Sequence, residues 1–93
     1  MTPSARPALA RRARLRFDRV GSGHVLLAPE RGFRLNESAA AVLRLCDGQR
    51  SLLQIAQKLA PPAQHARVLA DVLALADDLQ GRGLLTVTEP TEP

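Results

Sequence analysis

The stretch LLAPERGFRLN, from Leu26 to Asn36, constrains the fold of this chain more than any other. Two short apolar runs flank PERG. Pro29 presets the φ of a turn, and Gly32 can adopt the left-handed conformation of a type I turn followed by a G1 bulge. The pattern predicts a tight antiparallel hairpin whose short second arm passes at once into a helix. That arm is either where the sheet stops or an open edge at which another chain's strand can pair.

Upstream residues extend the hairpin into a larger sheet. RLRFDRV alternates polar and apolar residues and places Leu15 and Phe17 on one face, the period of a half-buried strand. GSG follows as a turn, and HVLLA is more continuously apolar. We therefore predict an antiparallel meander of three strands, at residues 14–20, 24–28 and 33–35.

Helical patterns follow the meander. Asn36 is the expected N-cap of the first helix, with Ser38 as the alternative, and Ser51 with Gln54 forms a capping box for the second. Apolar residues at helical spacing predict helices over residues 37–46, 51–60 and 64–80. LLTVT, at 84–88, is a short final strand or an extended tail.

Strands that precede helices in this way favour an α+β fold. The expected architecture is winged-helix-like, with a three-stranded N-terminal meander followed by a three-helix bundle. A chain of 93 residues makes one small domain. We expect a flexible N-terminal arm at 1–10, where Pro3 and Pro7 interrupt any helix, a single domain at 11–88, and a disordered tail at 89–93.

The cysteine content suggests a cytoplasmic protein, and the charge distribution suggests an acidic partner or an anionic surface. A GC-rich genome would produce the same abundance of Arg and Ala without selection for binding. The net charge is +4, but residues 1–34 carry eight Arg against two acidic residues, whereas residues 35–93 carry five basic and seven acidic groups. The single Cys46 cannot form an internal disulfide and fits a buried apolar site in a reducing compartment. No secretory signal and no run of ~20 apolar residues for a membrane span is evident.

Candidate catalytic and metal-binding groups are sparse. His24 and His65 lie on separate predicted elements, and Cys46 has no partner thiol. Nucleophile-elbow, HExxH, CxxC, Walker and GxGxxG motifs are all missing. We therefore expect no enzyme activity, no metal and no cofactor, although a small enzyme remains a third hypothesis.

A small winged-helix DNA-binding regulator is the main alternative to a peptide-binding protein. The third predicted helix carries Arg67 against three acidic residues, Asp71, Asp77 and Asp78. A helix of charge −2 is repelled by phosphates, so it is a poor reader of a DNA groove. Binding of an extended peptide at the open edge of the third strand, beside that helix, fits better. The simplest alternative to a peptide-binding site is that these residues form ordinary core and surface.

An ordered set of short motifs resembles the PqqD family of pyrroloquinoline quinone biosynthesis. The set comprises Leu26-Leu27 with Pro29-Glu30, then LNESAAAVLRLCDG from Leu35 to Gly48, then Ser51-Leu52 with Ile55, and finally Asp71-Val72 with Leu79. The resemblance covers residues 9 to about 85. Where this chain has Ala74–Ala76, the family often has a bulkier residue.

The resemblance implies a peptide chaperone with the fold of a RiPP recognition element. Such proteins bind the precursor peptide PqqA and present it to the radical-SAM enzyme PqqE, to which the cofactors belong; nucleic acid and membranes are not expected partners. The implied peptide site is Gly32, Phe33, Arg34 and Leu35, facing Val68, Asp71, Val72 and Leu75. A second copy of the chain can fill the same edge, so a homodimer through edge pairing or arm exchange is a further expectation.

Overall fold

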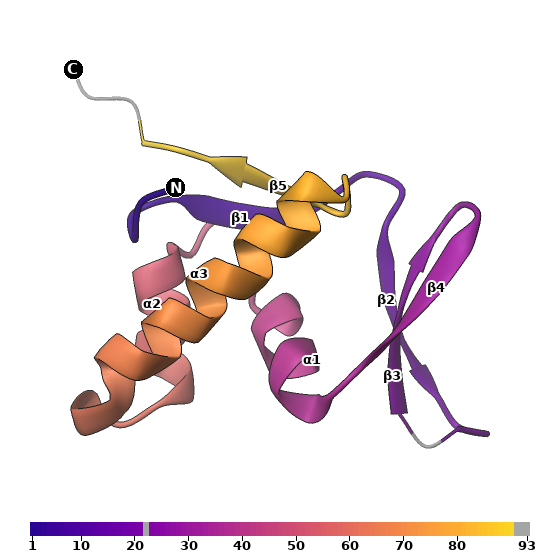
Figure 1. The fold of residues 1–93 in the computed structure, drawn as a ribbon, viewed down its shortest axis with the longest axis horizontal. Coiled ribbons are helices and arrows are strands. Elements are labelled where there is room, and N and C mark those ends of the chain that lie inside the picture. Colours follow the sequence, from indigo (N-terminus) through magenta and orange to yellow (C-terminus); the bar gives the residue numbers. More distant parts are fainter. Residues whose placement is uncertain (22, 91–93) are drawn as a thin grey trace.

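The computed structural model describes residues 1–21 and 23–90. Its elements, in chain order, are β1 (Arg6–Leu9), β2 (Arg14–Asp18), β3 (Gly23–Ala28), β4 (Arg31–Leu35), α1 (Glu37–Arg44), α2 (Leu52–Leu59), the 3-10 turn η1 (Pro62–Gln64), α3 (His65–Gly81) and β5 (Leu85–Thr88). They form two antiparallel sheets, one with the order β2-β3-β4 and one of β1 and β5. The three-stranded sheet stands to one side of the helices (Figure 1). The predicted α+β architecture with a meander and three helices is confirmed.

The β3–β4 hairpin is tighter than predicted. Ala28 pairs with Arg31, so the connection is the two-residue loop Pro29-Glu30. Gly32 then lies inside β4 opposite Leu27, and no extra residue is left over to form a bulge. Among the described glycines, positive φ occurs at Gly48 and Gly83 and not at Gly32. The predicted G1 bulge is therefore wrong, and β4 begins as a regular strand.

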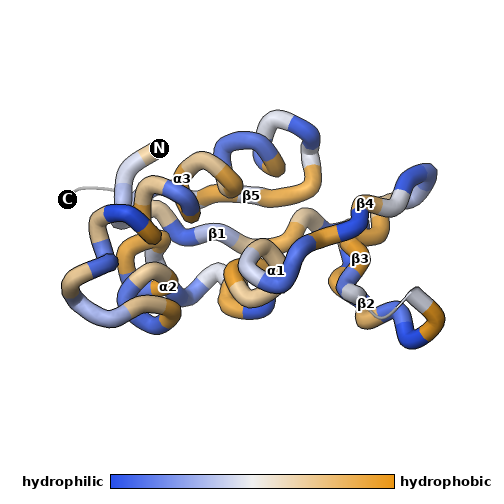
Figure 2. The backbone as a smooth tube through the Cα atoms, turned by 60° about the horizontal axis from the view of Figure 1, so that its bottom comes forward, coloured by the Kyte–Doolittle hydropathy of each residue, from blue (hydrophilic) through white to orange (hydrophobic). Residues whose placement is uncertain are grey.

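One face of the three-stranded sheet packs on the helices. Leu26 is fully buried at the centre of this face, where it pairs with Leu15 on β2 and Phe33 on β4. Full burial of a leucine side chain contributes roughly 1.5–3 kcal/mol. β3 is mostly hydrophobic along its length (Figure 2). The sheet is thus anchored at its middle, while its ends reach beyond the helices.

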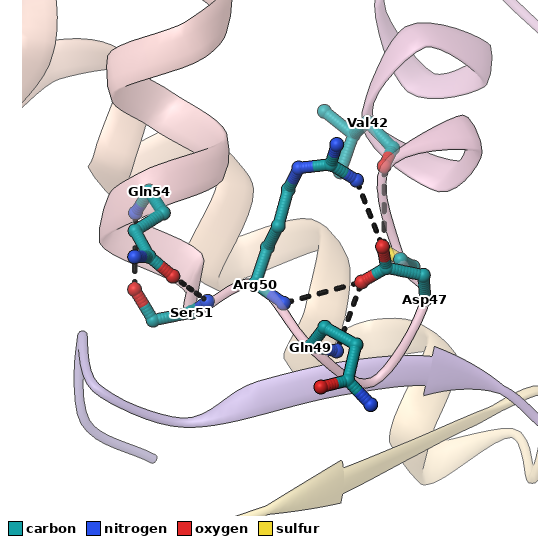
Figure 3. Close-up of polar contacts among 7 residues, drawn as sticks. Val42, Asp47, Gln49, Arg50, Ser51 and Gln54 are labelled. Atoms are coloured by element: carbon teal, nitrogen blue, oxygen red, sulfur yellow. Dashed lines mark hydrogen bonds and ion pairs between the residues drawn. The ribbon is translucent and has the colours of Figure 1, made fainter.

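Short polar contacts position the helix ends. The Asn36 side chain accepts a hydrogen bond from the Ala39 N–H at 2.7 Å, so Asn36 is the N-cap of α1 as predicted. At α2, Ser51 Oγ accepts from the Gln54 N–H at 3.1 Å, and Gln54 Oε1 accepts from the Ser51 N–H at 2.8 Å (Figure 3). This is the predicted capping box, which satisfies two free N–H groups of the first turn.

A carboxylate organises the connection between α1 and α2. Asp47 Oδ1 accepts hydrogen bonds from the N–H groups of Gln49, at 2.9 Å, and Arg50, at 3.1 Å (Figure 3). Asp47 Oδ2 also meets the Arg50 guanidinium at 2.9 Å. The two backbone N–H groups, followed by the nearby guanidinium, hold the pKa of Asp47 below its usual value of 3.8.

Most of the predicted flexible arm is instead ordered structure. Residues 6–9 form β1, which pairs along its length with β5. Ala5 and Pro7 are fully buried, and their carbonyls accept hydrogen bonds from the N–H groups of Leu52 and Gly48, both at 2.9 Å. The prediction was wrong because β1 is stabilised by a strand almost 80 residues away and by the α1–α2 region, and no local pattern reveals such partners.

The C-terminal strand is confirmed as β5, and the residues after it are only partly described. The Glu89 carboxylate accepts hydrogen bonds from the Thr2 N–H at 2.8 Å and the Thr2 hydroxyl at 2.7 Å. Glu89 therefore joins the two ends of the chain, contrary to its assignment to a disordered tail. Residues 91–93 of that predicted tail lie outside the described part of the structure.

The hydrophobic core lies between the helices, the β1–β5 pair and the buried face of the larger sheet. Its fully or nearly fully buried members include Ala5, Leu26, Leu43, Leu52, Ile55, Val72, Ala76, Leu79, Leu84 and Leu85. Within residues 1–21 and 23–90, no helix has the length and apolar character needed to cross a bilayer.

Candidate functional site

The outer side of β4 is an open sheet edge. β4 is the last strand in the order β2-β3-β4, and the C-terminal strand pairs with β1 rather than with it. In an antiparallel pair, residues alternate between those bonded to the partner strand and those whose N–H and C=O point away. Ala28 and Arg31 close the two-residue loop and are a bonded pair. It follows that Phe33 and Leu35 bond toward β3, whereas Gly32 and Arg34 direct their main-chain groups to the open side.

The side chain of Arg34 lies away from this edge, over the sheet face opposite the helices. Its guanidinium approaches the Asp18 carboxylate at 3.4 Å. A Cβ placed on Gly23 would be 3.1 Å from Arg34 Nη1, and one on Gly21 would collide with Nη2. The two glycines therefore leave room for the guanidinium, and Arg34 contributes to the open edge mainly through its backbone.

A hollow of about 280 Å³ separates β4 from the C-terminal half of α3. Its lining residues are Phe33, Arg34, Leu35, Asn36, Ala39, Leu75, Asp78, Leu79 and Arg82. Two guanidinium groups lie near the Phe33 ring, with that of Arg31 at 5.5 Å and that of Arg82 at 5.9 Å from its centroid. Asp78 holds Arg82 through an ion pair of 3.1 Å. This end of the hollow is thus both aromatic and charged.

A second, larger hollow of about 500 Å³ continues between α1 and the N-terminal half of α3. Its lining residues are Asn36, Ser38, Ala39, Ala41, Val42, Leu59, Arg67, Val68, Asp71, Val72 and Leu75. Asn36, Ala39 and Leu75 line both hollows, so the two form one groove that runs along α3 past the end of β4. Small alanine side chains on α1 leave space in it.

The structure brings the predicted site residues together in this groove, with one exception. Phe33, Arg34, Leu35 and Leu75 line the smaller hollow, and Val68, Asp71, Val72 and Leu75 line the larger one. Gly32 lines neither hollow and offers only its main chain at the open edge. Val72 is 1% exposed and can serve only as part of the floor.

Sequence reasoning missed the contribution of α1 and of the residue after α3. Asn36 was identified only as a helix cap, although it also lies where the two hollows meet. The sequence patterns assign no role in the site to Ala39 or Arg82, although both line the smaller hollow. The proximity of Phe33 and Arg82 depends on how β4 packs against α3, and no spacing along the chain reveals it.

The reactive side chains are engaged in structural contacts. His65 Nε2 lies 2.7 Å from the Ala60 carbonyl at the end of α2, and His24 Nε2 lies 3.3 Å from Arg44 Nη2. Cys46 Sγ donates to the Val42 carbonyl at 3.3 Å, and burial, reinforced by the nearby Asp47 charge, raises the pKa of its thiol to about 12. The described residues contain no cluster of three or more His, Cys, Asp or Glu side chains that could hold a metal ion.

Known proteins match this chain in sequence. Residues 23–85 match the family model of coenzyme PQQ synthesis protein D (PqqD). A "PqqA binding protein" of Rhodopseudomonas palustris (strain BisB5) is 40% identical over 95 residues, which span 100% of this chain and 93% of the relative. A "Bifunctional coenzyme PQQ synthesis protein C/D" of Methylorubrum extorquens is 47% identical over 81 residues, which span 85% of this chain and 22% of that protein.

A solved structure agrees with both the fold and the sequence match. The solution NMR structure for the PqqD truncation of Methylobacterium extorquens PqqCD, described as a stand-alone RiPP recognition element, aligns with a TM-score of 0.73 and 43% identity. The alignment covers 92% of this chain and 99% of that one. The family model spans well over half of the chain, and the Rhodopseudomonas relative is matched along nearly its whole length. The chain therefore belongs to the PqqD family.

Proposed function

We propose that this protein is a non-catalytic peptide chaperone of pyrroloquinoline quinone biosynthesis. It binds the precursor peptide PqqA as an added strand on β4 and presents it to the radical-SAM enzyme PqqE in the cytoplasm. The observation that carries the proposal is the open main-chain row at Gly32 and Arg34 beside the groove along α3. The names of the relatives that bind PqqA support the identity of the peptide.

Main-chain pairing and side-chain contacts have separate tasks in this proposal. Gly32 and Arg34 exchange N–H and C=O hydrogen bonds with the incoming strand, which supplies affinity for any extended peptide. Phe33, Leu35 and Leu75 form an apolar wall for alternate side chains of the peptide. Val68, Asp71 and the buried floor at Val72 extend the contact into the larger hollow.

The groove favours a peptide that continues past the strand. A strand of six to eight residues with groove contacts can reach sub-micromolar affinity, about −8 kcal/mol. The larger hollow begins where β4 ends, so residues following the paired segment can fill it. Holding the peptide beside an enzyme raises its effective concentration to roughly millimolar, and this accounts for the role of a protein without its own chemistry.

DNA binding is the weaker candidate because of the charge of α3. Within His65–Gly81, Arg67 is the single Arg or Lys and is outnumbered by Asp71, Asp77 and Asp78. A mobility-shift experiment at low salt tests this alternative, and we expect no shift.

An NMR titration of ¹⁵N-labelled protein with PqqA tests the proposed function. We expect the largest amide shift changes at Gly32 and Arg34 and at Val68 and Leu75, with a scrambled PqqA as control. Shift changes confined to the β1–β5 pair or to the β2 edge would contradict the proposed site. Absence of binding at millimolar peptide would contradict the function itself.

A further inference from the structure

The β2–β4 sheet has a second face, opposite the helices, that no described element covers. Strand alternation turns Val25 and Leu27 to this face, because Leu26 between them is fully buried on the other. A Cβ on Gly32 would lie 3.3 Å from Leu27 Cδ2 and 3.5 Å from Val25 Cγ1, which places Gly32 on this same side. Neither Val25 nor Leu27 belongs to the core cluster or packs against it.

Arginines flank Val25 on both neighbouring strands and Leu27 on one. Arg14 pairs with Leu27 and Arg16 with Val25 across β2–β3, and Arg34 pairs with Val25 from β4. Paired positions share a face of the sheet, so the three Arg side chains lie on the same face as the aliphatic pair. All three are exposed. We call this set of five residues the outer face.

The outer face has an excess of positive charge. Asp18 is the acidic residue of the sheet on this side, and it meets Arg34 at 3.4 Å. Arg14 and Arg16 are in no ion pair found among the described residues. Gly21 and Gly23 let the Arg34 guanidinium lie across the sheet, and the missing side chain at Gly32 leaves Leu27 only half-buried. The local sequence thus keeps this face basic and partly apolar.

We propose that the outer face docks onto an acidic surface of the enzyme that receives the bound peptide. This inference rests on the proposed function in one respect, the identity of that enzyme. Protein interfaces combine an apolar centre with a charged rim and are enriched in Arg, as found here. Phosphate backbones have no apolar group to cover Val25 and Leu27, and two aliphatic side chains are too few for insertion into a bilayer.

The location of the outer face suits a transfer between proteins. It lies on the opposite side of the sheet from α1 and the groove, and β4 belongs to both surfaces. An enzyme bound there leaves the groove along α3 open for the peptide. A small basic interface also gives fast, salt-dependent association, which fits a partner that must be released after each peptide.

Binding of PqqE to the full-length protein tests the inference, with and without PqqA, by biolayer interferometry at two salt concentrations. The variant is Arg14→Glu/Arg16→Glu, and Arg14→Gln/Arg16→Gln is a second variant with a smaller charge change. The matched control is Arg11→Glu/Arg12→Glu, which makes the same charge change at exposed positions in the turn before β2. Far-UV circular dichroism confirms that each variant folds.

We expect the Arg14/Arg16 reversal to weaken PqqE binding at least ten-fold and to reduce its salt dependence. The Gln variant should weaken it less, and the Arg11/Arg12 control should change it less than three-fold. PqqA affinity should stay within two-fold throughout, since neither Arg14 nor Arg16 lines the groove. Equal weakening by the control, unchanged PqqE binding in the test variant, or no PqqE binding to the wild type overturns the inference. Failure of the wild type to bind PqqA instead overturns the proposed function.

Discussion

Replacement of Arg34 by proline isolates the role of the open main-chain row. Proline removes the N–H that Arg34 directs away from β3, and its ring occupies the space that an added strand would use. A hydrogen bond contributes about 0.5–1.5 kcal/mol net, and an acceptor left buried without a partner costs about 1–3 kcal/mol. With about 1.4 kcal/mol per factor of ten, we expect Arg34→Pro to weaken PqqA binding more than ten-fold.

The fold should tolerate this substitution. Pairing of β4 with β3 does not use the Arg34 N–H, and proline is accepted at the open side of edge strands. The Arg34–Asp18 ion pair is also lost, but its side chains are 61% and 37% exposed, and such pairs contribute about 0–1 kcal/mol. Arg34→Ala is the matched control, because it removes the ion pair and keeps the N–H.

Isothermal titration calorimetry with PqqA compares the two variants directly. Arg34→Ala should bind within about three-fold of the wild type, and both variants should keep the helical circular dichroism signal. Phe33→Pro, which removes an N–H bonded to β3, should instead lower the melting temperature. The reasoning fails if Arg34→Pro and Arg34→Ala bind PqqA equally well, since main-chain pairing would then contribute nothing.

Four further predictions follow from single contacts. Leu75→Gln should weaken PqqA binding about ten-fold by calorimetry with little change in melting temperature, because Leu75 lines both hollows and is only partly buried. An unchanged affinity would exclude the groove as the PqqA-binding site. Asn36→Ala should lower the free energy of unfolding in urea by about 1 kcal/mol through loss of the α1 cap, and Asn36→Ser should recover most of it. The buried Cys46 thiol should react with iodoacetamide far more slowly in the native protein than in urea, and rapid labelling of the native protein would refute this. The free energy of unfolding should also fall above pH 9, because the unfolded thiol ionises there and the folded thiol, with a pKa of about 12, does not. Because the pKa of Asp47 is lowered in the folded protein, its stabilising effect is present above pH 3.8 and is lost as the pH falls through the pKa of the folded state. Asp47→Asn should therefore lose less stability than the wild type in an acid titration, and equal losses would contradict this prediction.

Local chemistry explains which elements could be predicted from the sequence. The cap at Asn36 and the capping box at Ser51 and Gln54 act within three residues, so their side chains identify the helix starts without tertiary information. The meander is similarly local, since its strands are joined by short turns. Gly32 shows the limit of this reasoning, because the choice between a bulge and a two-residue loop depends on the register of β3 against β4.

Long-range packing explains what the sequence did not reveal. β1 exists because β5 and the α1–α2 region satisfy its backbone, and its short sequence, which contains Pro7, resembles that of an unstructured arm. At the candidate site, the sequence pattern indicated an open strand edge beside an apolar helix stripe, and the individual residues came from the family resemblance. The contributions of Ala39 and Arg82 depend on the packing of α1 and α3 against β4. The spacing of apolar residues along the sequence does not indicate this packing.

The contact between Thr2 and Glu89 has a consequence for protein architecture. Since Thr2 and Glu89 meet beside β1 and β5, remote from β4 in both views (Figures 1 and 2), domains joined beyond these two residues would start away from the open edge of β4. Tethering to a larger polypeptide, as in the bifunctional relative, then requires no redesign of the recognition surface. The same proximity makes the chain suited to circular permutation, with new ends opened elsewhere on its surface.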